Sequence, residues 1–402
     1  MVDIDAYREK ARAWLESQAA AFGHAARRGL SVAEDLALGR RWQAAKHDAG
    51  YAGISWKKEH GGQGLGPLQK LAFEQEEMKH GFPNTYFAVS LGMPVPIMLR
   101  YLPDGWKQER ARAALRGDEI WCQLFSEPAA GSDLAGLRTR ATRDEATGDW
   151  IINGQKLWTT WAQHADYGVI VARTDPTVPK HKGLTYFWVD MKAPGVTVRP
   201  VKLAEGSSHV NEVFFDDVRI SDAQRLGPVG GGFGVAMETL VIERYSATDP
   251  AGFGPPLALL IEQAKTDQVR GRPAIEDGRV RERVARTYAI QNGLAAIHKK
   301  SLLALEAGLQ PGPEGALHKL VSVRTRQKLS EFAIDLKGVS GLRWDGDGER
   351  KDDWVASWIS APTGRIAGGA DEMLLNTIAE KILGLPQDHR PDKGVPFNAI
   401  AQ

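Results

Sequence analysis

The sequence predicts an α+β protein of several domains, in which a helical domain, an antiparallel β-barrel domain and a second helical domain follow one another. Two changes in the spacing of apolar residues support this prediction. Helical spacing gives way to short apolar or alternating runs near residue 119 and returns after about residue 226. Strands and helices do not alternate, which argues against a dinucleotide-binding fold of the Rossmann type. We therefore expect domains over residues 1–118, 119–226 and 227–402.

The first domain is expected to be helical because its apolar residues recur every three or four positions, with glycine and proline mostly between the segments. The expected helices cover residues 7–18, 32–48, 66–79 and 85–100. Pro94 and Pro96 interrupt the last of them. Proline lacks an amide donor and clashes with the preceding turn, so we expect a kink or a break there.

The middle of the chain is rich in β-branched and aromatic residues in short runs. These runs indicate strands near residues 120–125, 150–152, 167–173, 184–190 and 212–218. Turn clusters at residues 193–195 and 205–208 separate them and favour an antiparallel barrel or sandwich. A glycine-rich stretch at residues 227–234 lacks the Lys-Ser/Thr ending of a phosphate loop, and we interpret it as a hinge into the next helix.

Composition excludes several classes of function. Hydrophobic residues make up 43% and charged residues 25% of the 402 residues, which is typical of a soluble globular protein. The net charge of +1 predicts no attraction to nucleic acid or to anionic membranes. The single cysteine, Cys122, excludes an intramolecular disulfide and fits a reducing compartment. Neither a signal-peptide pattern nor a membrane-spanning apolar run occurs, so we expect a cytoplasmic protein.

Two short polar motifs are the most informative part of the chain. Phe-Ser-Glu-Pro-Ala-Ala-Gly-Ser-Asp occupies residues 125–133, and Gly-Gln-Lys-Leu-Trp-Thr-Thr occupies residues 154–160. Each stands at the end of a strand-like run. Together they offer hydroxyls, backbone amides and the large aromatic face of Trp158. This combination suits a flat heteroaromatic cofactor better than a metal or a phosphate alone.

These motifs, the order of the domains and the later Ile-Glu-Arg at residues 242–244 resemble the acyl-CoA dehydrogenase family of flavoenzymes. The resemblance covers nearly the whole chain and is looser in the last hundred or so residues. It implies a β-barrel that carries the flavin and a C-terminal four-helix-bundle-like domain. It also implies FAD as cofactor, an acyl-CoA as substrate and an electron-transfer flavoprotein as electron acceptor. The assembly would be a homodimer, a homotetramer or a heterotetramer with a paralogue.

The resemblance places the cofactor-binding residues mainly in the two motifs. They are Gln123, Phe125, Ser126, Gly131, Ser132, Trp158, Thr159, Thr160 and, near the C-terminus, Glu372. Ser126 would meet the pyrimidine side of the flavin, where donors stabilise the reduced state. Trp158 would pack against the ring and Thr160 would bond near N5. Gly131 would permit close approach to cofactor or substrate, with the Ser132 hydroxyl beside it. Singly, each residue also fits an ordinary turn or a core position.

The reaction implied by the resemblance needs a carboxylate that takes the α proton of the thioester while hydride leaves Cβ. In many family members this Glu lies in a C-terminal Tyr-Glu-Gly-Thr pattern, but here Gly368 occupies that position. A branch that includes the isovaleryl-CoA and long-chain dehydrogenases keeps its Glu on the helix after the barrel, just before an Arg. Glu243 is therefore the expected catalytic base, and Arg244 its neighbour at the substrate site. A solvent-facing charged pair is the alternative.

The chain departs from the family at the adenine end of FAD. The segment aligned with the family's Arg-x-x-Phe-Gly pattern, residues 267–271, reads Asp-Gln-Val-Arg-Gly, and the Gln-x-x-Gly-Gly pattern has become Asp-Leu-Lys-Gly-Val at residues 335–339. The adenine end would need other residues or another subunit. Arginines that could contact a diphosphate, or could form a solvated helix face, are Arg279, Arg281, Arg283 and Arg286.

Other functions remain open at this point. The histidines show no spacing typical of metal ligands, so no metal is expected. Within the same fold, a flavin oxidase or monooxygenase is one alternative to the dehydrogenase. A half-site or non-catalytic subunit of a hetero-oligomeric dehydrogenase is another. The length and shape of the acyl group are not determined by these residues.

Overall fold

The computed structural model describes residues 3–246, 257–309, 312–343 and 354–400, without the side chains of residues 243–246. The chain forms two compact units. The first unit contains residues 1–201, 208–248 and 390–402, and the second contains residues 202–207 and 249–389. The division at residues 118 and 226 stays a prediction.

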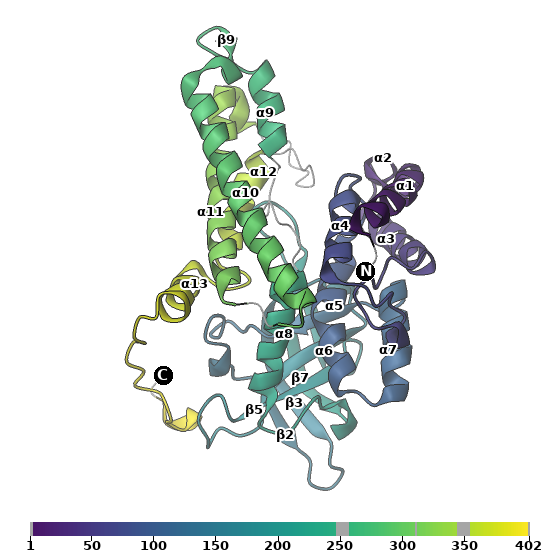
Figure 1. Ribbon diagram of the computed structural model, residues 1–402. Helices are drawn as coiled ribbons and strands as arrows, with labels where there is room; N and C mark the ends of the chain where they lie inside the picture. The colour runs from purple at the N-terminus through teal and green to yellow at the C-terminus, as the bar shows by residue number, and fades with distance from the viewer. Residues whose placement is uncertain (1–2, 247–256, 310–311, 344–353, 401–402) are drawn as a thin grey trace. The chain divides into compact units, whose positions relative to one another are not determined.

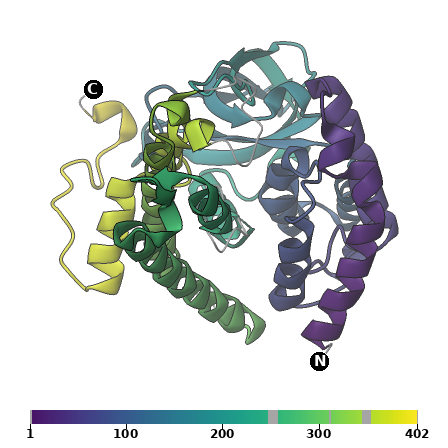
Figure 2. The same cartoon turned by 90° about the horizontal axis from the view of Figure 1, so that it is seen from above.

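The first unit begins with helices that gather beside a β-sheet (Figures 1 and 2). They are α1 (Ile4–Phe22), α2 (His24–Arg27), α3 (Val32–Asp48), α4 (Pro67–Glu77), α5 (Thr85–Gly92), α6 (Pro94–Tyr101) and α7 (Asp104–Arg116). The predicted break is confirmed, because α5 ends just before Met93 and Pro94 is the first residue of α6. Helices α5 and α6 contact the first strand of the sheet.

Helix α7 was not among the predicted helices. Its buried residues are Ala111, Ala114 and Leu115, so the apolar face consists mainly of alanine. Alanine favours helix formation, but it is only weakly apolar, so an alanine face differs little in hydrophobicity from the exposed face of the same helix. Gly117 ends the helix in a left-handed conformation at φ 81°.

The sheet contains seven strands. They are β1 (Trp121–Leu124), β2 (Arg140–Arg143), β3 (Trp150–Thr160), β4 (Tyr167–Arg173), β5 (Leu184–Asp190), β6 (Val196–Val201) and β7 (Val210–Ile220). Their order is β1-β4-β2-β3-β7-β6, and β5 pairs with β4. The sheet curls into a half-barrel, and helical regions precede and follow it in the sequence, which confirms the predicted α+β fold class. Strand β4 is buried along nearly its whole length, as its continuous apolar run indicates.

Two pairings differ from the predicted antiparallel sheet, because β4 pairs in parallel both with β1 and with β2, where Arg140 lies opposite Arg173. Strands β1 and β4 are parallel, with Trp121 opposite Tyr167. A parallel pair needs a long crossover, and here the complete β2–β3 hairpin lies between the two strands. Apolar patterns locate strands but do not report their relative direction.

Helix α8 (Gly232–Ser246) follows the sheet within the first unit. The glycine-rich stretch before it contacts β5, since the Gly230 amide donates to Thr185 Oγ1 at 3.1 Å. Val235, Ala236 and Thr239 of α8 are buried. The Tyr186 and Thr239 hydroxyls lie 3.1 Å apart in a hydrogen bond. The start of α8 is therefore fixed against the sheet.

The second unit is helical, as the sequence predicts. Its elements are α9 (Leu257–Thr266), the strands β8 (Gln268–Val269) and β9 (Arg272–Pro273), α10 (Gly278–Glu306), α11 (Glu314–Lys337), α12 (Trp354–Gly364) and α13 (Asp371–Thr377). Helix α11 contacts α9, α10, α12 and α13 (Figure 1). Its Leu329 and Ala333 join Leu257, Leu260 and Trp354 in an apolar core. No described helix is long and apolar enough to cross a membrane.

Candidate active site

The structure joins the two sequence motifs directly. The Leu157 amide donates to the Ser126 carbonyl at 2.8 Å. The Lys156 ammonium reaches back from β3 and donates to the Phe125 carbonyl at 3.1 Å. The turn after β1 and the end of β3, about thirty residues apart in sequence, therefore form one surface of the first unit.

A buried ion pair fixes this junction. Lys156 Nζ lies 2.8 Å from Glu127 Oε1, and the two side chains are 0% and 7% exposed. Glu127 also accepts the amides of Arg138 at 2.6 Å and Thr139 at 3.0 Å. A buried carboxylate with this many donors has its oxygens satisfied, so Glu127 ties the turn after β1 to the segment that leads into β2.

Each member of the pair changes the protonation of the other. Desolvation acts to raise the pKa of Glu127, but the charge of Lys156 and the hydrogen bonds outweigh it, so that this pKa lies below its usual value. Desolvation lowers the pKa of Lys156, although the Glu127 charge opposes that shift. The sequence analysis contained both residues within its motifs but gave them no role. Lys156 follows the polar residues Asn153 and Gln155 in β3, so the local pattern did not signal its burial.

Trp158 adopts a conformation unusual for its residue type. Its φ is 65°, and the β3–β7 register shifts between Lys156 and Thr159. This β-bulge leaves the Trp158 side chain 54% exposed beside the first motif. Such a conformation costs free energy at a bulky residue, and residues of this kind cluster at functional sites.

Two buried polar atoms near the motifs have no hydrogen-bond partner in the described structure. They are Thr159 Oγ1, in a residue that is 1% exposed, and Gln123 Oε1. Such atoms are rare in folded proteins unless a ligand or a water binds them. A flavin ring offers both donors and acceptors at its polar edge, so these residues fit FAD. Phe125 is buried against Tyr186, with ring centroids 5.8 Å apart.

The remaining predicted residues of the first unit lie at its surface or half-buried. Ser126 and Thr160 are half-buried, whereas Gly131 and Ser132 are exposed. A Cβ atom added at Gly131 would meet no atom within 4 Å. The packing of this chain therefore does not require glycine there, and the open space is compatible with a bound molecule.

The predicted base lies at the end of α8. Glu243 and Arg244 belong to this helix, but their side chains are outside the described residues. Position 243 follows the buried Thr239 by one helical turn. At the alternative position of the family, Gly368 has φ 65°, a left-handed conformation that favours glycine and disfavours glutamate.

Glu372 belongs to the second unit and is exposed at the start of α13. Its neighbour Asp371 is buried instead, and accepts from Arg324 Nε at 3.0 Å and Arg365 Nε at 2.9 Å. The structure thus does not bring Glu372 together with the two motifs within one unit.

The arginine cluster of α10 has the character of a solvated helix face. Arg286 and Glu282 form an (i, i+4) pair, and both side chains are about 70% exposed. Arg279 pairs with Asp277 at 3.4 Å and is also exposed. Arg283 lies over the Phe332 ring, 5.3 Å from its centroid. These partners favour the solvated-face interpretation over a diphosphate site.

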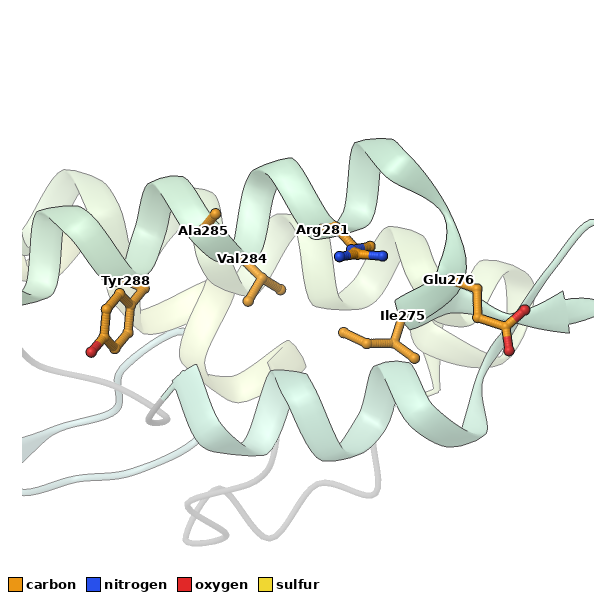
Figure 3. Close-up of a pocket in the computed structure, with 6 residues that line it drawn as sticks. All are labelled: Ile275, Glu276, Arg281, Val284, Ala285 and Tyr288. Atoms are coloured by element: carbon orange, nitrogen blue, oxygen red, sulfur yellow. The ribbon is translucent and has the colours of Figure 1, made fainter.

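A shallow groove lies beside this cluster in the second unit. It is lined by Ile275, Glu276, Arg281, Val284, Ala285 and Tyr288 (Figure 3). The side chains of Ile275, Val284 and Tyr288 point toward a common space in that view. Arg281, one of the arginines that could contact a diphosphate, lines the groove, but no residue of the two motifs does. Among the described residues, no group of three or more His, Cys, Asp or Glu side chains could hold a metal ion.

Comparisons with known protein families match most of the chain. Residues 122–218 match the family model "Acyl-CoA dehydrogenase, middle domain". Residues 230–383 match "Acyl-CoA dehydrogenase, C-terminal domain". The first match contains both motifs, and the second contains the predicted base.

Several relatives are similar over most of this chain. Acyl-CoA dehydrogenase IpdE1 of Mycobacterium tuberculosis is 34% identical over 400 residues, which cover 96% of this chain and 99% of the relative. Acyl-CoA dehydrogenase FadE34 of the same species is 35% identical over 358 residues, or 89% of this chain. The chain spans about half the length of FadE34, since the match covers 48% of that protein.

Solved structures share the fold. The ChsE4–ChsE5 complex from Mycobacterium tuberculosis aligns with a TM-score of 0.82 at 26% identity, covering 96% of this chain and 99% of the matched chain. The Tcur3481–Tcur3483 steroid ACAD aligns with a TM-score of 0.79 at 25% identity, covering 96% and 98%.

Proposed function

The chain belongs to the acyl-CoA dehydrogenase family, and we propose that it oxidises an acyl-CoA thioester to a trans-2-enoyl-CoA with FAD as its cofactor. One observation carries the proposal. The two motifs meet through the buried Lys156–Glu127 pair, and their junction offers an exposed indole and an unsatisfied buried hydroxyl. A flat cofactor with a polar edge satisfies both features.

Different residues of this chain would bind the flavin and take the α proton. Ser126, Thr159 and Thr160 would hold the polar edge of the flavin, and Trp158 would cover a face of the ring. When bound, FAD supplies the acceptor for the hydride that leaves Cβ. Glu243 would take the α proton from the thioester, and Arg244 would contact the substrate beside it. The electrons would then pass to an electron-transfer flavoprotein.

We propose that the acyl group is bulky and of the steroid-derived class. This assignment rests on the aligned structure whose name describes a steroid ACAD. A panel of acyl-CoA thioesters, from short linear chains to steroid-derived side chains, tests it with an artificial electron acceptor. Turnover confined to short linear chains would contradict the assignment without affecting the reaction type.

A second proposal concerns assembly. Both named structures are of paired chains, and in this chain Asp267 stands where the family places the arginine that holds the adenine end of FAD. We infer that a paralogue supplies this contact in a hetero-oligomer. This chain then contributes the flavin-ring motifs and the predicted base.

The test of the reaction is anaerobic addition of acyl-CoA to the yellow holoenzyme, purified with the paralogue where one is needed. Bleaching of the flavin absorbance with slow reoxidation in air supports a dehydrogenase. Fast reoxidation in air would favour an oxidase. Failure of every thioester to bleach a fully loaded flavin would contradict the proposal.

The test of the base is Glu243→Gln. We expect flavin content and acyl-CoA binding to persist while turnover falls by about a thousandfold or more, because the amide cannot accept the α proton. The matched control is Glu238→Gln on the same helix, where the carboxylate pairs with Arg100 at 2.9 Å. Retained turnover in Glu243→Gln would move the base elsewhere.

A further inference from the structure

We propose that the segment of residues 390–400 acts as a strap that holds the Gly131–Asp133 turn in the shape that accepts the thioester substrate. This inference rests on the proposed function, because that function places substrate or cofactor at Gly131 and Ser132. The segment belongs to the same compact unit as the turn, although residues 134–389 separate them in the sequence.

The first connection is a lysine held between two carboxylates. Lys180 Nζ lies 2.8 Å from Asp133 of the turn and 2.6 Å from Asp392 of the strap. The Lys180 side chain is only 15% exposed. Desolvation opposes its charge, but the hydrogen bonds that Lys180 donates to both carboxylates raise its pKa above the usual value. One ammonium group thus ties the strap to the turn.

The second connection is through the backbone. The Phe397 amide donates to the Val178 carbonyl, and the Asn398 amide to the Pro176 carbonyl, each at 3.0 Å. Pro179 and Pro396 form an isolated β-bridge between the same two segments. The strap therefore lies along the loop that joins β4 to β5, where its yellow trace ends in Figure 1. Lys180 belongs to this loop.

The third connection is through Arg173. Its guanidinium carbon lies 3.4 Å from the centroid of the Phe397 ring. The same guanidinium donates to the carbonyls of Ala135 at 2.6 Å and Leu137 at 3.1 Å, immediately after the turn. It also donates to the Lys180 carbonyl at 3.2 Å. Arg173 is 4% exposed, so these contacts are shielded from water.

The connections converge on the turn. Lys180 holds it at Asp133, and Arg173 holds the chain two residues further on. The strap contacts both of these cations, one with a carboxylate and one with an aromatic ring. The turn itself is exposed and makes few contacts of its own at Gly131. Loosening the strap should consequently widen the range of shapes that the turn samples, with little effect on the flavin-ring residues.

The experiment uses Asp392→Asn in the FAD-loaded protein, in its complex with the paralogue if that is the functional form. We expect the KM for acyl-CoA to rise about two- to fivefold, the effect of losing one partly exposed ion pair. The kcat and the flavin content should stay unchanged. Asp392→Glu should restore the KM, since it keeps the charge. The matched control is Asp388→Asn, an exposed aspartate four residues earlier.

A second measurement separates the strap from the proposed function. Hydrogen–deuterium exchange of amides 131–137 should be faster in Asp392→Asn than in wild type or in Asp388→Asn. Equal exchange in all three proteins, or an unchanged KM, would overturn the strap. Faster exchange in a protein that turns over no acyl-CoA would support the strap and refute the proposed function instead.

Discussion

Glu127 and Lys156 are two charged residues that form a buried ion pair. Lys156 is fully buried, and the Glu127 carboxylate and the Phe125 carbonyl together offset the cost of removing its ammonium from water. Such a pair contributes little net stability compared with an apolar pair, but it is directional. It brings the Phe125 carbonyl, the Glu127 carboxylate and β3 into one arrangement. Its value to the protein therefore lies in the position of the flavin-facing residues.

Lys156→Met should lower the free energy of unfolding by about 3–5 kcal/mol, because Glu127 would remain buried without a counter-charge. FAD content should fall with it. Chemical denaturation and the ratio of flavin to protein absorbance measure the two effects. Lys182→Met, at an exposed lysine, is the control and should change neither.

The double variant Lys156→Met with Glu127→Gln discriminates between charge and packing. Glutamine keeps one acceptor oxygen, enough for either the Arg138 or the Thr139 amide, and carries no charge. We expect it to recover part of the lost stability and little of the lost FAD content. A double variant less stable than the single variant would contradict a role for charge.

At the scale of elements, an ion-pair network joins α1 to α4. Glu76 of α4 is 2% exposed and contacts Arg8 at 3.2 Å and Arg12 at 3.0 Å on α1, and Lys79 at 2.5 Å in the turn that follows α4. Desolvation acts to raise the pKa of Glu76, but the hydrogen bonds from these cations outweigh it and lower the pKa to about 2. The ionised form is thus favoured in the folded protein.

This shift predicts a pH dependence. A carboxyl whose folded pKa lies below its unfolded value of 4.5 stabilises the fold fully above that pH and loses the contribution as pH falls toward about 2. Glu76→Gln should cost on the order of 1–3 kcal/mol at pH 7 and progressively less below pH ~4. Unfolding measured against pH tests this, with the exposed Glu16→Gln as control. A difference that is independent of pH would exclude the mechanism.

The sequence predicted elements well where one local rule decides. Pro94 broke the fourth helix because its ring forbids continuation, whatever the surroundings. Helix α7 was not predicted, because its buried face consists mainly of alanine and its own pattern shows little amphipathic contrast. The parallel pairing of β1 with β4 was not predicted either. The relative direction of two strands depends on the path of the chain between them, which the apolar pattern does not show.

The candidate site, like the helices and strands, could be predicted from local motifs but not in its tertiary contacts. The family comparison confirms FAD and the enzyme class, whereas the assignment of motif residues to the flavin stays a prediction. The sequence did not reveal that Lys156 reaches Glu127 or that Lys180 joins Asp133 to Asp392. Each of these contacts depends on a tertiary approach between distant segments. The roles of Glu243 and Glu372 stay predictions.

At the scale of the whole molecule, the second unit exposes large apolar side chains on several helices and turns. Among them, Leu303 is 48% exposed, Trp358 46%, Val339 88% and Ile366 72%. Apolar surface in this quantity is characteristic of subunit interfaces. Together with the absent adenine-end arginine, it predicts that FAD binding depends on a partner chain.

The chain purified alone should therefore contain less than one FAD per polypeptide, and co-expression with its paralogue should bring the ratio toward the full value for the complex. Absorbance at 450 and 280 nm, after size-exclusion chromatography coupled to light scattering, measures flavin content and mass together. Leu303→Asp on α10 should weaken assembly and lower flavin content, because it places a charge on apolar surface that a partner would bury. Val32→Asp is the control, since Val32 is 52% exposed on a helix of the first unit. Full FAD content in the isolated monomer would show that this chain binds the adenine end by itself.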